Sequence, residues 1–172
     1  MAVIKGGVTA AKGFLASGLA AGIKKSGKKD LALLYSEVPA VAAGAFTTNR
    51  FQASPVRISK LHLRNKMHQA IIVNSGNANC ANGHAGDRAA VTMADYIARA
   101  LCLVRREVLV ASTGIIGRPL PVEKIDPSPN DNTPLSPVPS PTRSRSLLRA
   151  LAPSLFLQPS GSLPSAAGNT RA

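Results

Sequence analysis

The first 125 residues alternate between short apolar runs and polar breaks, and the runs predict β-strands. A small, glycine-punctuated apolar stretch extends from Phe14 to Ile23 and ends in a lysine-rich turn. Pro55–Ser59 alternates in polarity, and we expect an edge strand there because proline cannot donate to a strand ladder. The other predicted strands are Leu31–Tyr35, Val41–Thr47, Ala70–Val73 and Val108–Ala111.

One segment has apolar residues at helical spacing. It predicts a helix from Arg88 to about Leu103, with Asp87 as the N-cap, because an aspartate can accept from the free amides of a first turn. The residues expected to face the sheet are Ala90, Met93, Ala94, Ile97 and Leu101. Strands precede this helix rather than alternating with helices, so the pattern favours an α+β fold over a doubly wound sheet.

Composition changes near Ile125. From Asp126 to Ala172 the chain has no Lys, Ile, Glu, Tyr or Met, and it contains nine of the 13 prolines. Each proline removes a backbone donor and fixes φ, which rules out regular structure where prolines are this dense. We therefore divide the chain into a folded body, residues 1–125, and a Pro/Ser/Arg-rich tail, residues 126–172, which we expect to be disordered.

Length and hydropathy exclude several classes of protein. The chain has 172 residues, which suits one domain, and 45% of them are hydrophobic. No apolar run approaches the ~18–20 residues of a membrane span, and Met1–Gly7 lacks the features of a secretory signal. The two cysteines, Cys80 and Cys102, do not form a disulfide framework. We expect a cytoplasmic protein with reduced thiols.

A net charge of +13 raises the question of nucleic acid. The dense basic cluster is Lys24–Lys29, with Ser-Gly at its centre, which indicates a turn between strands. It is either a solvated loop or a nucleic-acid patch. No aromatic residue lies among the lysines to stack on bases, which argues against nucleic acid as a partner.

Two polar motifs follow predicted strands. Asn74–Asn79 is either a structural turn or a loop that lines a site, and it is not a phosphate loop because no Gly-Lys-Ser/Thr follows. Ser112-Thr113-Gly114 is either a plain turn or a pair of donors, a hydroxyl and an amide, that converge on a developing oxyanion. Cys80 and His84, with His62 and His68, do not have the spacing of a zinc site, so we expect no metal.

Together these blocks resemble one family, the bifunctional ornithine acetyltransferases (glutamate N-acetyltransferases) of arginine biosynthesis. The resemblance covers residues 5–125, in the order of the family, and corresponds to the first third or so of a member. The blocks that carry it are Gly7–Ala10 with Gly13-Phe14, Asp30–Ser36, Ala43–Arg50, Ala70–Asn79, Val108–Gly117, Pro119–Pro121 and Lys124-Ile125.

The resemblance implies acetyl transfer from N2-acetylornithine to glutamate, in some members with acetyl-CoA as a further donor, and no bound cofactor. It implies self-cleavage before an internal threonine, whose freed N-terminus makes it the nucleophile, and α and β chains that remain together as an α2β2 heterotetramer. The implied fold is α+β, with sheets sandwiched between helices. Thr113 and Gly114 match the pair that forms the family's oxyanion hole.

The resemblance stops after Ile125, so the segment that resembles the family does not include the family's threonine nucleophile. Thr133, Thr142 and Thr170 do not stand in the family's cleavage motif, and the substrate-binding residues are unknown. We expect a truncated or frameshifted enzyme that is inactive alone. The alternatives are a small basic binding protein without enzymatic activity and a gene fragment without function.

Overall fold

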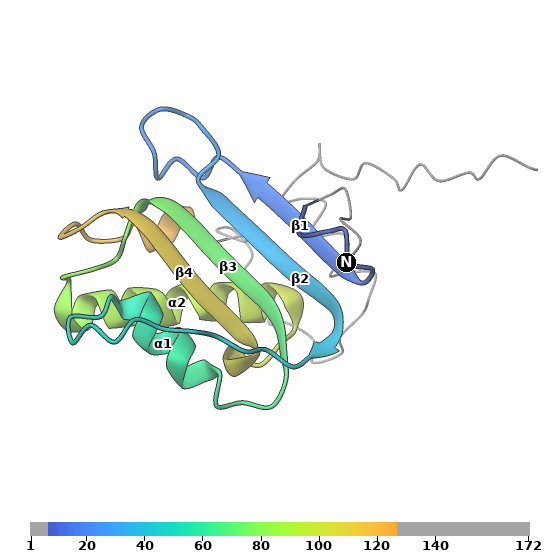
Figure 1. Cartoon of the computed structure of the whole chain (residues 1–172). Coiled ribbons are helices and arrows are strands. Elements are labelled where there is room, and N and C mark those ends of the chain that lie inside the picture. The colour runs from blue at the N-terminus through green and yellow to red at the C-terminus, as the bar shows by residue number, and fades with distance from the viewer. Residues whose placement is uncertain (1–6, 127–172) are drawn as a thin grey trace, which may run out of the picture.

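The computed structural model describes residues 7–126, which form one four-stranded sheet with two helices (Figure 1). The predicted disordered tail lies outside the described residues, apart from Asp126. The strands are β1 (Phe14–Leu19), β2 (Leu31–Ala40), β3 (His68–Asn77) and β4 (Val108–Ile115), and the helices are α1 (Ser54–His62) and α2 (Gly83–Leu101). Short 3-10 turns lie at Arg105–Glu107 and Val122–Lys124.

The sheet has the order β1-β2-β3-β4, so each strand pairs with its neighbour along the chain. β2 pairs antiparallel with both β1 and β3, and β3 and β4 pair in parallel. Parallel strands need a crossover connection, and α2 supplies it. The C-terminal ends of β3 and β4 therefore lie side by side at one end of the sheet (Figure 1).

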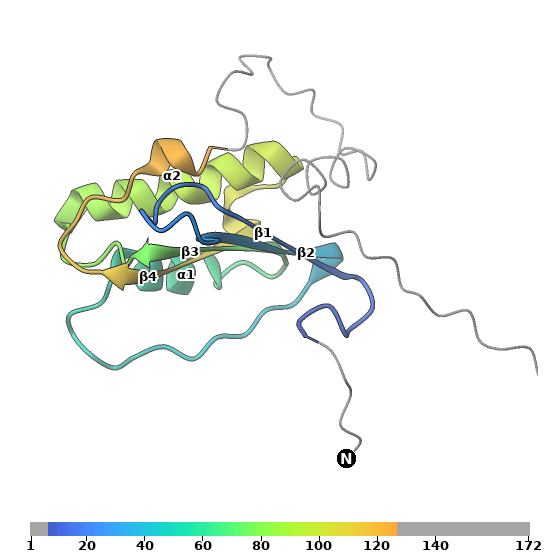
Figure 2. The ribbon, with the colours of Figure 1, turned by 90° about the horizontal axis from the view of Figure 1, so that it is seen from above.

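α2 covers one face of the sheet and makes the core (Figure 2). Its apolar residues recur every three or four positions, so they lie on the side that meets the strands. The core residues that α2 contributes are Ala90, Met93, Ala94, Ile97, Ala98 and Leu101, and those from the strands are Leu31, Leu33, Tyr35, Ala70, Ile72, Val108 and Val110. On the opposite face, Leu34, Ile71 and Val73 are only half-buried.

α1 lies along the outer edge of β4 (Figure 1). The Ser59 hydroxyl donates to the Val110 carbonyl at 2.6 Å and accepts from the Val110 amide at 2.9 Å. His62 Nδ1 lies 2.7 Å from the Val108 carbonyl oxygen. These side chains occupy the backbone groups that an open sheet edge would offer to another chain.

The α+β fold class is confirmed, and so are the cores of three predicted strands. Leu31–Tyr35, Ala70–Val73 and Val108–Ala111 all lie inside observed strands. The predicted edge strand at Pro55–Ser59 is wrong, because this segment lies within α1. Proline is favoured in the first turn of a helix, where its missing amide costs no hydrogen bond.

The predicted strand at Val41–Thr47 is also wrong. This segment has no regular structure and leads across the face of the sheet opposite α2 (Figures 1 and 2). Residues 41–43, together with Leu34, Ile71 and Leu109, line a cavity of about 210 Å³ on that face. Most of this run is nevertheless exposed, with Val41 at 82%, and only Ala42 and Phe46 are half-buried.

Three predicted boundaries differ from the structure. β3 continues to Asn77 and β4 to Ile115, so most of Asn74–Asn79 and all of Ser112–Gly114 belong to strands rather than turns. α2 begins at Gly83, before the predicted cap at Asp87, whose carboxylate instead pairs with Arg57 of α1. Within residues 7–126 no helix is long and apolar enough to cross a membrane.

Candidate functional site

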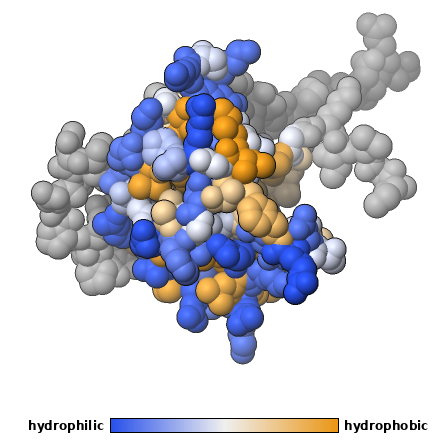
Figure 3. Space-filling model, turned by 90° about the vertical axis from the view of Figure 1, so that its left-hand side faces the viewer, coloured by the Kyte–Doolittle hydropathy of each residue, from blue (hydrophilic) through white to orange (hydrophobic). Residues whose placement is uncertain are grey.

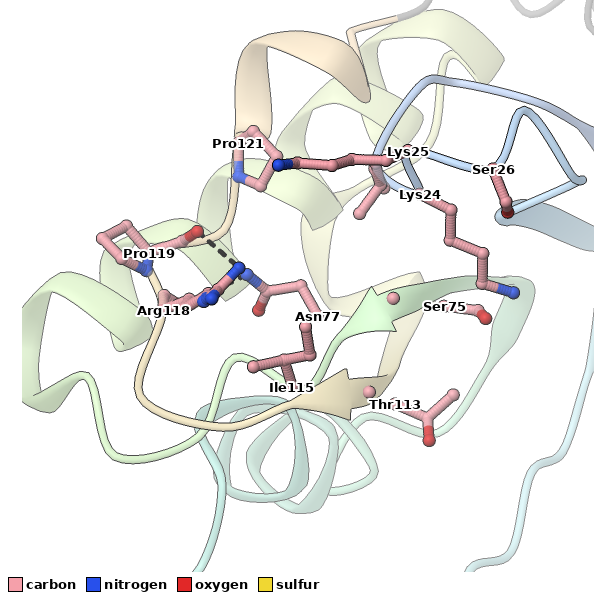
Figure 4. A pocket seen from close by; sticks show the side chains of 13 residues that line it. Lys24, Lys25, Ser26, Ser75, Asn77, Thr113, Ile115, Arg118, Pro119 and Pro121 are labelled. Atoms are coloured by element: carbon pink, nitrogen blue, oxygen red, sulfur yellow. Dashed lines mark hydrogen bonds between the residues drawn. The ribbon is translucent and has the colours of Figure 1, made fainter.

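A cavity of about 730 Å³ opens at the end of the sheet where the parallel strands β3 and β4 finish. Three segments enclose it: the lysine turn between β1 and β2, the end of β3, and the end of β4 with the loop that follows (Figure 4). Its lining residues are Ile23, Lys24, Lys25, Ser26, Ser75, Gly76, Asn77, Thr113, Gly114, Ile115, Arg118, Pro119 and Pro121. Ends of parallel strands are a common place for ligands in α/β sheets.

Two glycines in register, Gly76 and Gly114, lie next to each other in the lining. A Cβ atom on Gly114 would lie 2.4 Å from the carbonyl carbon of Gly76, and Gly114 has φ +133°. A Cβ atom on Gly76, at φ +102°, would lie 2.8 Å from Cγ of Lys24. Only glycine allows this backbone path and this approach, so at these two positions the main chain itself lines the cavity.

A group of asparagines holds the loop around the cavity. Asn77 Nδ2 donates to the carbonyl oxygens of Arg118 and Pro119 at 3.2 and 2.9 Å. Asn82 Nδ2 donates to the same Arg118 carbonyl at 2.7 Å. Asn77 is buried, so its amide bonds to the loop are shielded from water, while the Asn82 bond is exposed. The loop after β4 is therefore tied to the end of β3.

The lysine turn is fastened in the same way. The buried carboxylate of Asp30 accepts from the backbone amides of Ala21 at 2.6 Å and Lys24 at 2.7 Å. From the other side, Lys124 Nζ donates to the Gly22 carbonyl at 2.7 Å. Each link joins a charged group to the backbone, which is the stronger class of hydrogen bond. The turn is thus held over the cavity.

The charge of the cavity lining has one sign. Lys24, Lys25 and Arg118 line it, and no Asp or Glu is among its described lining residues. The end of the molecule that carries this cavity is the left-hand side of Figure 1, and its surface mixes large hydrophilic areas with hydrophobic patches (Figure 3). A cleft lined by one sign of charge concentrates ligands of the other sign. The lining favours an anion.

The predicted pair, Thr113 and Gly114, lies together in the lining of this cavity. Of the asparagine motif, Ser75, Gly76 and Asn77 also line it, which agrees with the site-lining alternative for that segment. The sequence did not single out Lys25 or Arg118 for this place. The lysine turn was conspicuous in the sequence, but only the folded chain shows that it closes over the strand ends.

The predicted turn at the lysine cluster is confirmed, since it connects β1 to β2. Lys28 and Lys29 are exposed, as a solvated loop would have them, while Lys24 and Lys25 belong to the cavity. Among residues 7–126, no group of three or more His, Cys, Asp or Glu is placed to hold a metal ion.

Two buried polar atoms next to the cavity have no hydrogen-bond partner within the part of the chain that the structure describes: Asn74 Oδ1 and Ser112 Oγ. The strand register puts these residues opposite each other, one position before Ser75 and Thr113. His62 and His68 are buried away from the cavity, in contact with main-chain carbonyls. Burial lowers the pKa of His62, and the nearby Arg105, Arg106 and His68 lower it further, against a raising effect of its bond to Val108.

Comparison with known proteins finds one family model, the ArgJ family, which matches residues 15–137. Among curated relatives, the arginine biosynthesis bifunctional protein ArgJ of Gloeobacter violaceus is 59% identical over 123 residues, which are 71% of this chain and 30% of the relative. The ArgJ protein of Thermosynechococcus vestitus is 54% identical over 71% of this chain and 29% of the relative. The chain thus spans about three-tenths of the length of these relatives.

Two solved structures are similar to the fold. The ArgJ protein of Bacillus halodurans matches with a TM-score of 0.69 and 36% identity, covering 81% of this chain and 70% of that one. Ornithine acetyltransferase of Mycobacterium tuberculosis, solved in complex with ornithine, matches with a TM-score of 0.67 and 45% identity, covering 69% of this chain and 65% of that one.

Proposed function

Since this chain belongs to the ArgJ family, we propose that it supplies the charge-stabilising part of an acetyltransferase of arginine biosynthesis. The reaction is acetyl transfer from N2-acetylornithine to glutamate, with acetyl-CoA as a possible second donor. In this proposal the nucleophilic threonine belongs to a part of the family enzyme outside the segment that this chain matches, and the cavity stabilises the charge that the threonine creates. The α2β2 assembly belongs to the same proposal.

Each half of the transfer passes through a tetrahedral intermediate. The threonine oxygen attacks the acetyl carbonyl carbon, and the carbonyl oxygen takes up a negative charge. We assign the Thr113 hydroxyl and the Gly114 amide as the donors that stabilise this oxyanion. Collapse of the intermediate expels the ornithine amine and leaves an acetyl ester on the threonine. The amine of glutamate then attacks the ester carbonyl carbon through a second intermediate of the same charge. Collapse of this intermediate breaks the ester C–O bond, returns the proton of the amine to the threonine oxygen and releases N-acetylglutamate.

One observation supports this assignment most directly: Thr113 and Gly114 are consecutive residues in the lining of a cavity at the C-terminal ends of two parallel strands. Gly114 is held against Gly76 with no room for a side chain. A rigid backbone donor is what oxyanion stabilisation needs, because a preorganised dipole requires no rearrangement when the charge appears. The neighbouring cations contribute a field of the right sign.

The test is reconstitution. The purified chain is mixed with a separately expressed remainder of a family enzyme, which begins at the position matching Asp126, and acetyl transfer from N2-acetylornithine to glutamate is measured. We expect no transfer by the chain alone and transfer by the mixture. Thr113→Ala should lower kcat of the mixture by roughly 10²–10³-fold, while Thr113→Ser, which keeps the hydroxyl, should lower it far less.

The matched control is Thr48→Ala, at an exposed threonine outside the cavity, which should leave kcat unchanged. Transfer by the chain alone that is indifferent to Thr113→Ala would show that nucleophile and site are both misassigned. Equal activity of the Thr113→Ala and wild-type mixtures would show that the Thr113 hydroxyl does not stabilise the oxyanion.

A further inference from the structure

We propose that Asn77 is a positioning residue for the oxyanion pair, because it fixes the backbone around Gly114 without binding a ligand itself. In its link to acetyl transfer, the proposal rests on the proposed function. The geometry does not depend on that function. Asn77 is buried at the end of β3 and lines the cavity. In the register of the sheet it pairs with both Thr113 and Ile115, the residues on either side of Gly114.

The side-chain amide of Asn77 is fully committed within the protein. Its Nδ2 donates to the carbonyl oxygens of Arg118 at 3.2 Å and Pro119 at 2.9 Å (Figure 4). Its Oδ1 accepts from the backbone amide of Asn79 at 2.8 Å. A side-chain amide has two N–H groups and one carbonyl oxygen, and here both N–H groups already have acceptors. The side chain therefore orients the protein and not a substrate.

The main chain of Asn77 is held as well, at the point where the register between β3 and β4 shifts. Asn74, which is completely buried, donates from its Nδ2 to the Asn77 carbonyl at 2.8 Å. The next amide along the chain, that of Ala78, donates to the Ile115 carbonyl at 2.9 Å. Register shifts bend a strand and can re-aim the groups beside them. The bent backbone opposite is that of Gly114, at φ +133°.

The loop after β4 is bent, and its bend explains why an asparagine stands at this position. Arg118 and Pro119 are consecutive, and both carbonyl oxygens lie within hydrogen-bond distance of one nitrogen. Such a link needs two N–H groups on that nitrogen, which neither a serine hydroxyl nor an aspartate carboxylate supplies. At the start of the loop, Gly117 has φ +74°, and its amide donates to the Cys80 carbonyl at 2.9 Å. The backbone that follows Gly114 is thus anchored at successive points.

The first measurement is kcat and KM of the reconstituted mixture. Asn77→Leu removes the amide at similar size, and it should lower kcat roughly 10–100-fold while KM stays within about twofold, because misplaced donors weaken only the transition state. Asn77→Gln, which keeps both N–H groups on a longer stem, should lose less. The effect of Asn77→Leu should be smaller in a Thr113→Ala background, since residues that act on one step are not additive.

The second measurement is amide hydrogen exchange of the full chain, which needs no turnover. Exchange at Gly117 should accelerate about tenfold or more in Asn77→Leu, because two hydrogen bonds that hold the loop closed are lost. Asn82→Ala removes the other donor to the Arg118 carbonyl from a less buried position outside the strand. It should accelerate the same exchange by a smaller factor, without any substitution in the core of the sheet.

The matched control is Asn65→Leu. The Asn65 amide donates to the Met67 carbonyl at 2.7 Å, in the loop between α1 and β3 and outside the cavity. The variant loses the same kind of bond, and it should change neither kcat nor exchange at Gly117. Far-UV circular dichroism and the thermal midpoint verify that each variant is folded.

The outcomes separate this proposal from the proposed function. Unchanged exchange at Gly117 in Asn77→Leu would overturn the positioning role. So would an unchanged kcat in a mixture that transfers acetyl groups, a raised KM with the same kcat, or an equal loss of kcat in Asn65→Leu. A wild-type mixture without transfer would refute the proposed reaction, and exchange at Gly117 would then decide by itself whether Asn77 fixes this backbone.

Discussion

At the scale of single residues, the close approach of β3 to β4 at the cavity depends on two glycines, which have no side chains. Gly76 and Gly114 face each other in adjacent strands, and both have positive φ. Their bare backbones let the strand ends approach and leave the main chain exposed to the cavity. The nearby Gly117 also has positive φ, but a Cβ atom there would meet nothing within 4 Å. We therefore expect substitution by alanine to cost a different amount of stability at Gly114 than at Gly117.

Gly114→Ala should destabilise the chain by about 2–4 kcal/mol, since strain at positive φ and overpacking against Gly76 act together. Gly117→Ala carries the backbone strain alone and should cost about 1 kcal/mol. Urea unfolding followed by circular dichroism measures both. Equal losses of stability for the two variants would show that the approach of Gly114 to Gly76 is not tight.

His62 should make stability depend on pH. Burial lowers its pKa below the usual value of 6.5, so protonation is easier in the unfolded chain than in the folded one. Its stabilising effect is complete above pH 6.5 and is lost as pH falls toward the lowered folded pKa, with a slope of at most about 1.4 kcal/mol per pH unit. Urea midpoints at pH 8 and pH 5 measure the loss.

The control for this pH dependence is a pair of substitutions. His62→Gln removes the titrating ring and should reduce the difference between the two pH values. His84→Gln, at an exposed position, should retain the wild-type difference. The assignment fails if both variants keep the full pH dependence.

At the scale of elements, α1 acts as a cover for the edge of β4. Ser59 satisfies both the amide and the carbonyl of Val110, and His62 contacts the carbonyl of Val108. Most helices of a sheet protein pack on a face, as α2 does. α1 instead replaces a fifth strand, and its polar side chains stand in for a backbone ladder.

Ser59→Ala should therefore leave two buried backbone groups of Val110 without partners and cost about 1–3 kcal/mol. Hydrogen exchange of the Val110 amide should also accelerate, because its protecting acceptor is gone. Lys60→Ala, at the exposed neighbour on the same helix, should change neither quantity. Unchanged exchange at Val110 in Ser59→Ala would mean that the edge is protected by packing alone.

The elements also show what the sequence could predict. Ala70–Val73 and Val108–Ala111 were recognisable because continuous β-branched and apolar runs favour strands, although Ile71 and Val73 are only half-buried. Pro55 was misleading, because proline fits both a strand edge and a first helical turn, and five residues are too few to distinguish the two periods. Polar residues ended the predicted strands too early at Asn74 and Ser112, because polarity can mark a site as well as a turn.

The candidate site was predictable only in part. Thr113 and Gly114 came from family resemblance, and the structure places them in a cavity with Lys24, Lys25 and Arg118. The contribution of the cations depends on how the loop between β1 and β2 returns over the strand ends. That path is set by Asp30 and Lys124, which are far apart in sequence, so no local pattern reveals it.

At the scale of the whole molecule, the positive charge and the covering of the two sheet faces are unevenly distributed. The chain carries a net charge of +13, and one cluster of its cations closes over the cavity. One sheet face is covered by α2, while Leu34, Ile71 and Val73 on the other face are only half-buried. The basic turn Lys24–Lys29 contains no aromatic residue, so it supports electrostatic attraction to nucleic acid but no stacking on bases.

Binding to duplex DNA should accordingly be weak and independent of sequence. If the basic turn neutralises about four phosphates, the logarithm of the binding constant should fall with the logarithm of salt with a slope of about −3.6. Fluorescence anisotropy with two unrelated duplexes measures slope and selectivity together. A preference for one duplex that survives physiological salt would favour a nucleic-acid function over the enzymatic one.

The strand order has a consequence for how the chain is made. Because β1, β2, β3 and β4 pair in the order in which they are synthesised, each new strand emerges from the ribosome with its partner already present. The β1–β2 hairpin needs nothing downstream for its hydrogen bonds. The β3–β4 pair waits for the whole of α2, which at ~5–20 residues per second means a delay of a few seconds. During that delay, Ile72 and its neighbours lack their helical cover, so nascent chains halted within α2 should be the ones most readily bound by chaperones.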